Sequence, residues 1–62
     1  MIFRVNIEMD NSAFADNPGA ELERILDEIK KNIHYVNVAD GWKKLIKDEN
    51  GNMVGYAMIT NE

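Results

Sequence analysis

The chain has 62 residues, a formal net charge of −4 and no cysteine. A chain of this length forms one domain, which buries only about 60% of the surface that its unfolded form exposes. Without cysteine, neither disulfides nor a thiolate metal cluster can stabilise that small core. No run reaches the roughly 18 apolar residues of a membrane-spanning helix, and the first residues lack the apolar region of a signal peptide. We therefore expect a cytoplasmic protein.

Apolar and polar residues alternate at the start of the chain. Phe3, Val5, Ile7 and Met9 are separated by single polar residues, and a period of two is typical of a half-buried strand. We predict a strand over residues 2–10.

A segment rich in turn-forming residues comes next and leads into a helix. Pro18 suits the first helical position, and Asp16 or Asn17 suits the N-cap. Apolar residues then recur at spacings of three and four, which predicts an amphipathic helix over residues 18–34. Its apolar side consists of Leu22, Ile25, Leu26, Ile29 and Ile33.

The other side of this helix is charged. Residues 8–28 hold seven acidic residues and one basic residue, a net charge of −6. Glu21 and Glu23 near the helix start complement the helix dipole, so a solvated face is the plain interpretation. The alternative is a partner-binding role for four of the carboxylates, those of Asp16, Glu23, Asp27 and Glu28.

Residues 34–41 fit a short helical extension, a short strand or a loop, and we favour a loop that Asp40 and Gly41 close. After it we predict two strands, over residues 42–48 and 53–60, joined by the turn signal Asn50-Gly51.

Two turns are open for this hairpin. A two-residue type I′ turn at Asn50-Gly51 would put Trp42, Lys44 and Ile46 on one face with Gly55, Ala57 and Ile59. A type I turn that starts at Asp48, with Gly51 left-handed, would put them with Val54, Tyr56 and Met58 instead. Gly55 and Ala57 suit a face on which a helix packs closely, so we favour the first turn.

These elements predict an α+β fold, a single β-α-β-β domain with a three-stranded antiparallel sheet and one helix packed on one face. We expect the strand order first, third, second. A single helix covers one face only, so we expect the other face to expose Leu45, Val54, Tyr56 and Met58. Monomers rarely leave a large apolar patch in water, which favours a protein partner or a second copy of the chain over this face. The alternative is that the stems of Lys43 and Lys47 shield scattered apolar side chains.

Two stretches of the chain carry a resemblance. Their patterns are Asp10-Asn11-x-Ala13-Phe14-x-Asp16-x-Pro18-x-x-Glu21-x-x-Arg24-Ile25-Leu26 and Asp48-x-Asn50-Gly51-Asn52-x-Val54-Gly55. The chain resembles a group of short uncharacterised proteins of bacteriophages and integrative elements. No activity comes with the resemblance. It implies a mobile-element accessory protein in the host cytosol, of a kind that binds and blocks host machinery such as a restriction or CRISPR nuclease.

Catalysis and metal binding find little support in the residues. Ser12 and His34 are the only serine and the only histidine, and a straight helix between them would hold them about 20 Å or more apart. We expect His34 to act as a helix C-terminal residue favoured by the dipole. Two stretches look like calcium loops, but Ala15 and Met53 stand where the sharp turn needs glycine. We expect no catalytic residue, no metal and no cofactor.

Three hypotheses of function follow. The first is an acidic inhibitor that acts by protein–protein interaction, of the anti-CRISPR or anti-restriction type, and that forms a homodimer through the sheet. The second is a small nucleic-acid-binding module, which the net charge disfavours; it would use Trp42, Lys43, Lys44, Lys47 and Tyr56. The third is a structural homodimer component of a larger particle.

Overall fold

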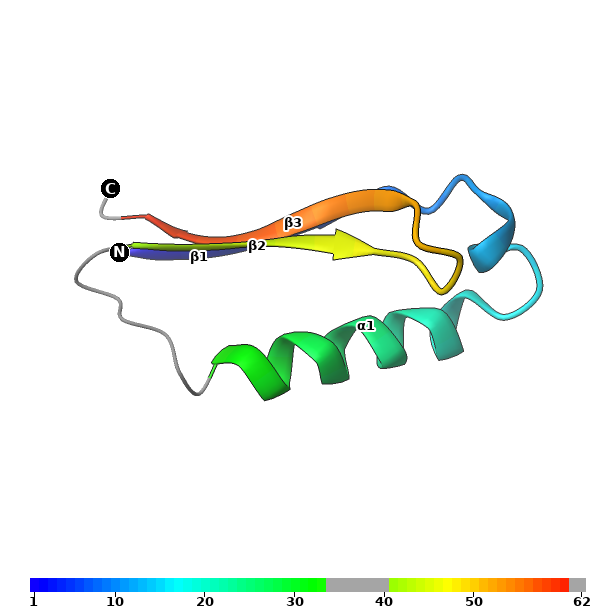
Figure 1. The fold of residues 1–62 in the computed structure, drawn as a ribbon, viewed down its shortest axis with the longest axis horizontal. Coiled ribbons are helices and arrows are strands. Elements are labelled where there is room, and N and C mark those ends of the chain that lie inside the picture. Colours follow the sequence, from blue (N-terminus) through cyan, green and yellow to red (C-terminus); the bar gives the residue numbers. More distant parts are fainter. Residues whose placement is uncertain (34–40, 61–62) are drawn as a thin grey trace.

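The computed structural model describes residues 1–33 and 41–60. In chain order they form strand β1 (Ile2–Ile7), a short 3₁₀ helix η1 (Ser12–Phe14), helix α1 (Pro18–Ile33) and strands β2 (Trp42–Lys47) and β3 (Met53–Thr60). The strands make one antiparallel sheet in the order β1-β3-β2, and α1 lies along one face of it (Figure 1). The predicted α+β class and strand order are confirmed. The loop expected before β2, with His34 in it, lies outside the described residues.

Two asparagine side chains cap the helices at either end of the turn-rich segment before α1. Asn11 caps η1, because its side-chain oxygen accepts a hydrogen bond of 3.1 Å from the Ala13 N–H. Asn17 caps α1 in the same way, accepting a hydrogen bond of 3.1 Å from the Ala20 N–H. Pro18 then occupies the first helical position, where its missing N–H has no partner to lose. Of the two N-cap candidates, the structure therefore selects Asn17.

Two strands are shorter than the sequence predicts. β1 ends at Ile7, although the Glu8 N–H still donates to the Val54 carbonyl over 2.8 Å. The regular β1–β3 pairing ends with Ile7 and Gly55, next to the irregular part of β3. β2 ends at Lys47, because Asp48 already belongs to the turn.

The core lies between α1 and the side of the sheet that faces it. Its buried members are Phe14, Ile25, Ile29, Ile46, Val54 and Ala57. The predicted apolar side of the helix is only partly buried, since Leu22 and Ile33 are half-buried and Leu26 is 54% exposed. η1 supplies the aromatic ring of Phe14, which closes the end of the core near the hairpin turn.

The hairpin combines the turn of one alternative with the strand pairing of the other. The Gly51 N–H donates to the Asp48 carbonyl over 3.1 Å, and Gly51 has a φ of 85°, so the chain makes a type I turn followed by a left-handed glycine. The favoured type I′ turn is therefore wrong. Nevertheless, Ile46 pairs with Gly55, Lys44 with Ala57 and Trp42 with Ile59, as that alternative required.

A bulge in β3 reconciles these two observations. Lys47 pairs with Met53 and Ile46 with Gly55, so β3 holds one residue more than β2 between these two pairs. That extra residue is Val54, and the bulge turns its side chain into the core. A single inserted residue thus restores the register that the turn alone would have shifted.

Gly55 is small because of a neighbouring strand and not because of the helix. A Cβ built at this position would lie 1.8 Å from the carbonyl oxygen of Asn6 and 2.8 Å from its carbonyl carbon. Both atoms belong to the backbone of β1, which cannot retreat without breaking the ladder. The expectation that the helix demands small residues here is wrong for Gly55.

Candidate functional site

One face of the sheet is left uncovered by α1, and we call it the open face. Residues that pair across the strands point to the same side, so the register assigns each side chain to one face. Ile46 and Ala57 are buried under α1, and the alternate residues therefore point away from it. The open face consists of Ile2, Arg4, Asn6, Lys43, Leu45, Tyr56, Met58 and Thr60.

The centre of the open face is apolar and its surroundings are polar. Leu45 and Tyr56 are paired on neighbouring strands, and Leu45 is 52% exposed. The Lys43 Nζ lies 5.4 Å from the centroid of the Tyr56 ring, within the range of a cation–π contact. Arg4 donates a hydrogen bond of 3.4 Å to the Thr60 hydroxyl at the other side. The face therefore joins a leucine, a tyrosine and a methionine to basic neighbours.

Val54 does not belong to this face. The sequence predicts it beside Tyr56 and Met58 because residues two apart in a strand share a side. The bulge breaks this alternation, and Val54 is only 6% exposed among the core residues. The predicted surface of Leu45, Val54, Tyr56 and Met58 is therefore corrected to three residues.

The residues proposed for nucleic-acid binding do not form one surface. The register puts Trp42 and Lys44 on the side of the sheet that faces α1, whereas Lys43 and Tyr56 lie on the open face. The Trp42 ring faces the Phe3 ring instead, with centroids 6.4 Å apart. A single nucleic-acid strand cannot stack on both aromatic rings from one side of the sheet.

The four predicted partner-binding carboxylates are all exposed. Glu23 and Asp27 project from α1 opposite to Ile25 and Ile29, as the helical period requires. They therefore point away from the sheet, on the side of the molecule opposite to the open face. Glu28 lies at the edge instead, where it and Leu45 border the same shallow groove between α1 and β2. Asp16 lies in the turn before α1, next to Asn17 and Glu21.

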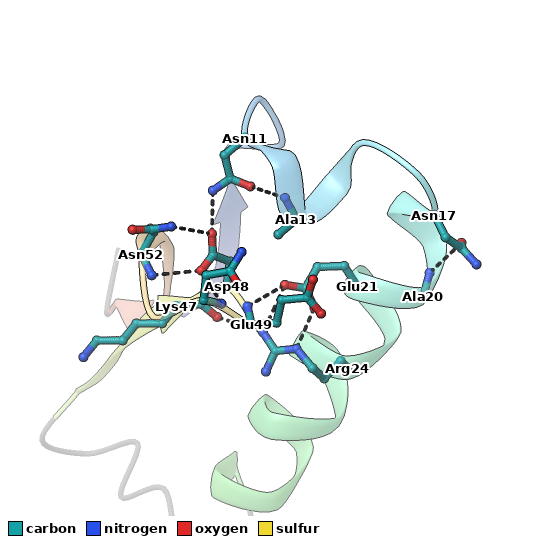
Figure 2. A network of polar contacts seen from close by, with 11 residues as sticks. Asn11, Ala13, Asn17, Ala20, Glu21, Arg24, Lys47, Asp48, Glu49 and Asn52 are labelled. Atoms are coloured by element: carbon teal, nitrogen blue, oxygen red, sulfur yellow. Dashed lines mark hydrogen bonds and ion pairs between the residues drawn. The ribbon is translucent and has the colours of Figure 1, made fainter.

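A network of buried polar groups joins α1 to the hairpin turn, and Figure 2 shows it. Glu21, which the sequence places on the solvated face, is only 5% exposed. Its carboxylate accepts hydrogen bonds from the Arg24 Nε over 2.6 Å and from the Glu49 backbone N–H over 2.9 Å. Arg24 in turn donates to the Lys47 carbonyl over 2.9 Å. The pair thus binds the helix to the start of the turn, on either side of Asp48.

Asp48 forms the second half of this network and is only 4% exposed. Its Oδ1 accepts hydrogen bonds from the backbone N–H groups of Asn50 and Asn52, over 2.9 and 2.8 Å. Its Oδ2 accepts from the side-chain amides of Asn11, over 2.6 Å, and Asn52, over 3.2 Å. Every oxygen of this carboxylate is therefore directed at N–H donors.

The network lowers the pKa of both buried carboxyl groups. The Arg24 side chain lowers the pKa of Glu21 more than burial raises it. Burial raises the pKa of Asp48, but the hydrogen bonds from Asn52, Asn50 and Asn11 together outweigh it and leave the pKa below its ordinary value. Both groups are therefore held as carboxylates.

The hydrogen bonds give this cluster a structural role between the helix and the hairpin turn. Both buried carboxylates accept hydrogen bonds from N–H groups of the fold, which balance their charge. Within residues 1–33 and 41–60, no three acidic or histidine side chains lie close enough together to hold a metal ion.

The sequence analysis missed this network, although the residues that carry the resemblance form most of it. Asn11, Glu21, Arg24, Asp48 and Asn52 all belong to the two quoted patterns. The signal that could have found it is Asp48 followed by two asparagines at alternate positions, which is typical of an Asx turn. Residues of the two sequence patterns therefore form the hydrogen bonds that hold the hairpin turn against the helix and η1.

Comparison with known proteins adds no relative to this picture. No protein-family model, no curated protein and no solved structure matches the chain. Among the described residues, no helix is long and apolar enough to cross a membrane.

Proposed function

We propose that the protein acts by binding another protein through the open face of its sheet. The observation that carries this proposal is the cluster of Leu45, Tyr56 and Met58 at the centre of the face that α1 leaves uncovered. Burying a leucine side chain contributes about 1.5–3 kcal/mol, and tyrosine is enriched among residues that dominate binding energy. Lys43 and Arg4 beside this centre favour a partner that brings acidic groups to the rim.

The setting of this activity comes from the resemblance to short mobile-element proteins. We propose an accessory protein of that kind, whose partner is a nuclease of host defence of the CRISPR or restriction type. The exposed carboxylates of Glu23 and Asp27 support a role in approach to such a nuclease, because its nucleic-acid channel is basic and attracts acidic surfaces. Because Glu23 and Asp27 lie opposite to the open face, they act by long-range attraction during approach and do not touch a nuclease that is bound to the open face.

The proposal treats the chain as a binding protein and not as an enzyme. In the part of the chain that the structure describes, the buried carboxylates serve the fold, and Ser12 lies exposed. Neither arrangement provides a nucleophile activated by a base.

The experiment is a cleavage assay with purified defence nucleases and a molar excess of the purified chain. We expect the chain to inhibit cleavage by at least one of them. Tyr56→Ser should weaken inhibition by about 30-fold or more, since a dominant contact is worth about 2 kcal/mol. The matched control is Met9→Ser, which removes an apolar side chain that is 39% exposed outside the open face and should leave inhibition intact.

A further variant tests the acidic surface separately from the open face. Asp27→Lys should slow association at low salt and have little effect at high salt, because steering by exposed charges is screened. The proposal fails if the folded chain inhibits none of the nucleases, or if Tyr56→Ser and Leu45→Ser inhibit as well as the parent chain.

A further inference from the structure

Strand β1 is an edge strand whose side chains are almost all exposed. Phe3 is 51% exposed, Val5 39% and Ile2 38%. Among residues 1–33 and 41–60, β3 is the only strand that pairs with it. Apolar residues therefore line an edge beside which the described part of the chain places no further strand.

The two edges of the sheet differ in how they resist pairing. β2 carries Lys43, Lys44 and Lys47 and has an irregular register against β3, which are features that prevent a second sheet from joining an edge. β1 holds neither a proline nor a lysine, and its pairing with β3 runs without a break from Ile2 to Ile7. Of the two edge strands in the described part of the chain, β1 is therefore the better suited to continue the sheet.

The outward backbone groups of β1 are identified by the pairing on its inner side. The Glu8 N–H donates to the Val54 carbonyl, in register with the β1–β3 ladder. Hydrogen bonding alternates along an antiparallel strand, so the even-numbered residues bond to β3. The N–H and C=O groups of Phe3, Val5 and Ile7 consequently point out from the sheet.

Phe3, Val5 and Ile7 can pair with the same three residues of a second copy, with Val5 at the centre of the pairing. In an antiparallel pair of two β1 strands, Val5 would lie opposite Val5 of the other copy, and each Phe3 opposite an Ile7. Each such pair exchanges two hydrogen bonds, so three pairs make six. Their side chains all lie on the side of the sheet that faces α1, because Val5 pairs with the buried Ala57.

Charge also favours a second copy in this antiparallel arrangement. Arg4 and Glu8 are the only charged residues from Ile2 to Glu8. With Val5 opposite Val5, the diagonal neighbours of each Arg4 are Glu8 and Arg4 of the other copy. The dimer therefore gains two attractive Arg4–Glu8 pairs and has one repulsive Arg4–Arg4 pair. Parallel pairing in register would instead place each charge beside its own kind.

The helix leaves room for this contact. Three strands span about 14 Å and a helix about 10 Å, so one helix covers about two of them. The Arg24 and Glu28 side of α1 borders β2. The helical period therefore turns the opposite flank, with Leu26, toward β1. Leu26, Phe3 and Val5 make an uncovered apolar strip along the edge.

We infer that two copies of the chain associate through their β1 edges into a dimer with a continuous six-stranded sheet. Both helices lie on the same side of this sheet, and the two apolar strips meet between them. Both open faces lie on the other side and stay available. The inference is independent of the proposed function, which uses the open face.

The test is amide hydrogen exchange of the full chain followed by NMR at two protein concentrations. We expect the amides of Phe3, Val5 and Ile7 to gain at least about tenfold protection as the concentration rises, because the dimer must open before they exchange. The Asn6 amide, which bonds to β3, serves as the internal control and should be protected at both concentrations. Unprotected amides at all three positions up to about 1 mM would overturn the inference.

Two variants separate this edge from the open face, with the oligomeric state measured by sedimentation. Val5→Lys places two lysines beside each other on the twofold axis and should give a folded monomer. Leu45→Lys changes the open face and should leave the dimer intact. A dimer that Leu45→Lys abolishes and Val5→Lys preserves would assign self-association to the open face and overturn the inference. If Val5→Lys does not fold, the exchange measurement on the parent chain still decides the question.

Discussion

The Asn11 side-chain amide donates a hydrogen bond of 2.6 Å to the Asp48 carboxylate, which lies 37 positions later in the chain. This contact fastens the segment after β1 to the turn between β2 and β3. The same turn is held from the other side by Glu21, which accepts from the Glu49 N–H over 2.9 Å. Two buried carboxylates thus take the place of the disulfides that small domains often use to join distant segments.

Asn11→Ala should destabilise the fold. The substitution removes both the cap of η1 and one donor to Asp48, and the loss of a cap costs about 1 kcal/mol. For a domain of this size, thermal unfolding should shift down by about 4–8 °C for each kcal/mol lost. The control is Asn50→Ala, because Asn50 reaches Asp48 through its backbone N–H, which alanine keeps. A larger loss for Asn50→Ala than for Asn11→Ala would contradict the assigned network.

Gly55→Ala should be among the most damaging substitutions in the chain. The new Cβ would meet the backbone of Asn6 at 1.8 Å, so β1 must move away from β3. We expect a loss of about 3 kcal/mol or more in the free energy of unfolding, measured by urea denaturation.

Gly19→Ala is the matched control for this prediction. Its Cβ would meet no atom closer than 3.7 Å, in the first turn of α1. Alanine favours a helix by up to about 1 kcal/mol over glycine, so this variant should be as stable as the parent or more so. Equal stability of the two variants would show that β1 does not approach β3 as described.

Gly51→Ala should cost less than Gly55→Ala, and for a different reason. Gly51 has a φ of 85°, but no atom lies within 4 Å of a Cβ at this position. The cost is the left-handed backbone alone, about 1–2 kcal/mol in denaturant unfolding. Gly51→Asn should lose less, because asparagine tolerates this conformation better than alanine does. An unchanged stability of Gly51→Ala would contradict the turn assignment.

The stability of the fold should decrease in acid. The pKa of Glu21, ordinarily 4.5, and that of Asp48, ordinarily 3.8, are both lowered in the folded chain. The folded state therefore binds fewer protons than the unfolded state in this range. The contribution of each group is complete above its ordinary pKa and is lost as the pH falls below it, through the lowered value.

Glu21→Gln should remove part of this pH dependence. The unfolding free energy of the variant should fall less steeply below pH 4.5 than that of the parent chain, measured by urea denaturation at several pH values. The control is Glu23→Gln, two positions away on the exposed side of α1. Parallel curves for Glu21→Gln and the parent would show that the ion pair with Arg24 does not control acid unfolding.

The sequence predicted the class and the strand order correctly, because these depend on periodicity. The pairing of Trp42 with Ile59 was expected from a type I′ turn that the structure does not have, and it is found because the bulge at Val54 offsets the type I turn. The sequence could not place Val54, since a bulge of one residue moves a side chain to the other face and leaves no mark in the alternation. The small size of Gly55 was attributed to the helix, because the sequence does not show which strand lies beside it. A residue larger than glycine would collide with the backbone of Asn6, which lies almost fifty positions earlier in the chain.

The candidate site was predictable only in part. Leu45, Tyr56 and Met58 were found because one helix cannot cover two faces of a sheet. Glu21 was assigned to solvent because a glutamate in the first turn of a helix is usually exposed there. Its burial depends on Arg24 and on the backbone of Glu49, and only the folded hairpin brings the latter within reach.

The central claim is that the open face is where a protein partner binds, and NMR cross-saturation on a complex with an inhibited nuclease tests it most directly. Saturation of the nuclease signals should pass to the amides of Leu45, Tyr56 and Met58, with little transfer to Glu21, Arg24 and Asp48. Transfer confined to α1 or to the hairpin turn, with none to the three residues of the open face, would contradict the claim.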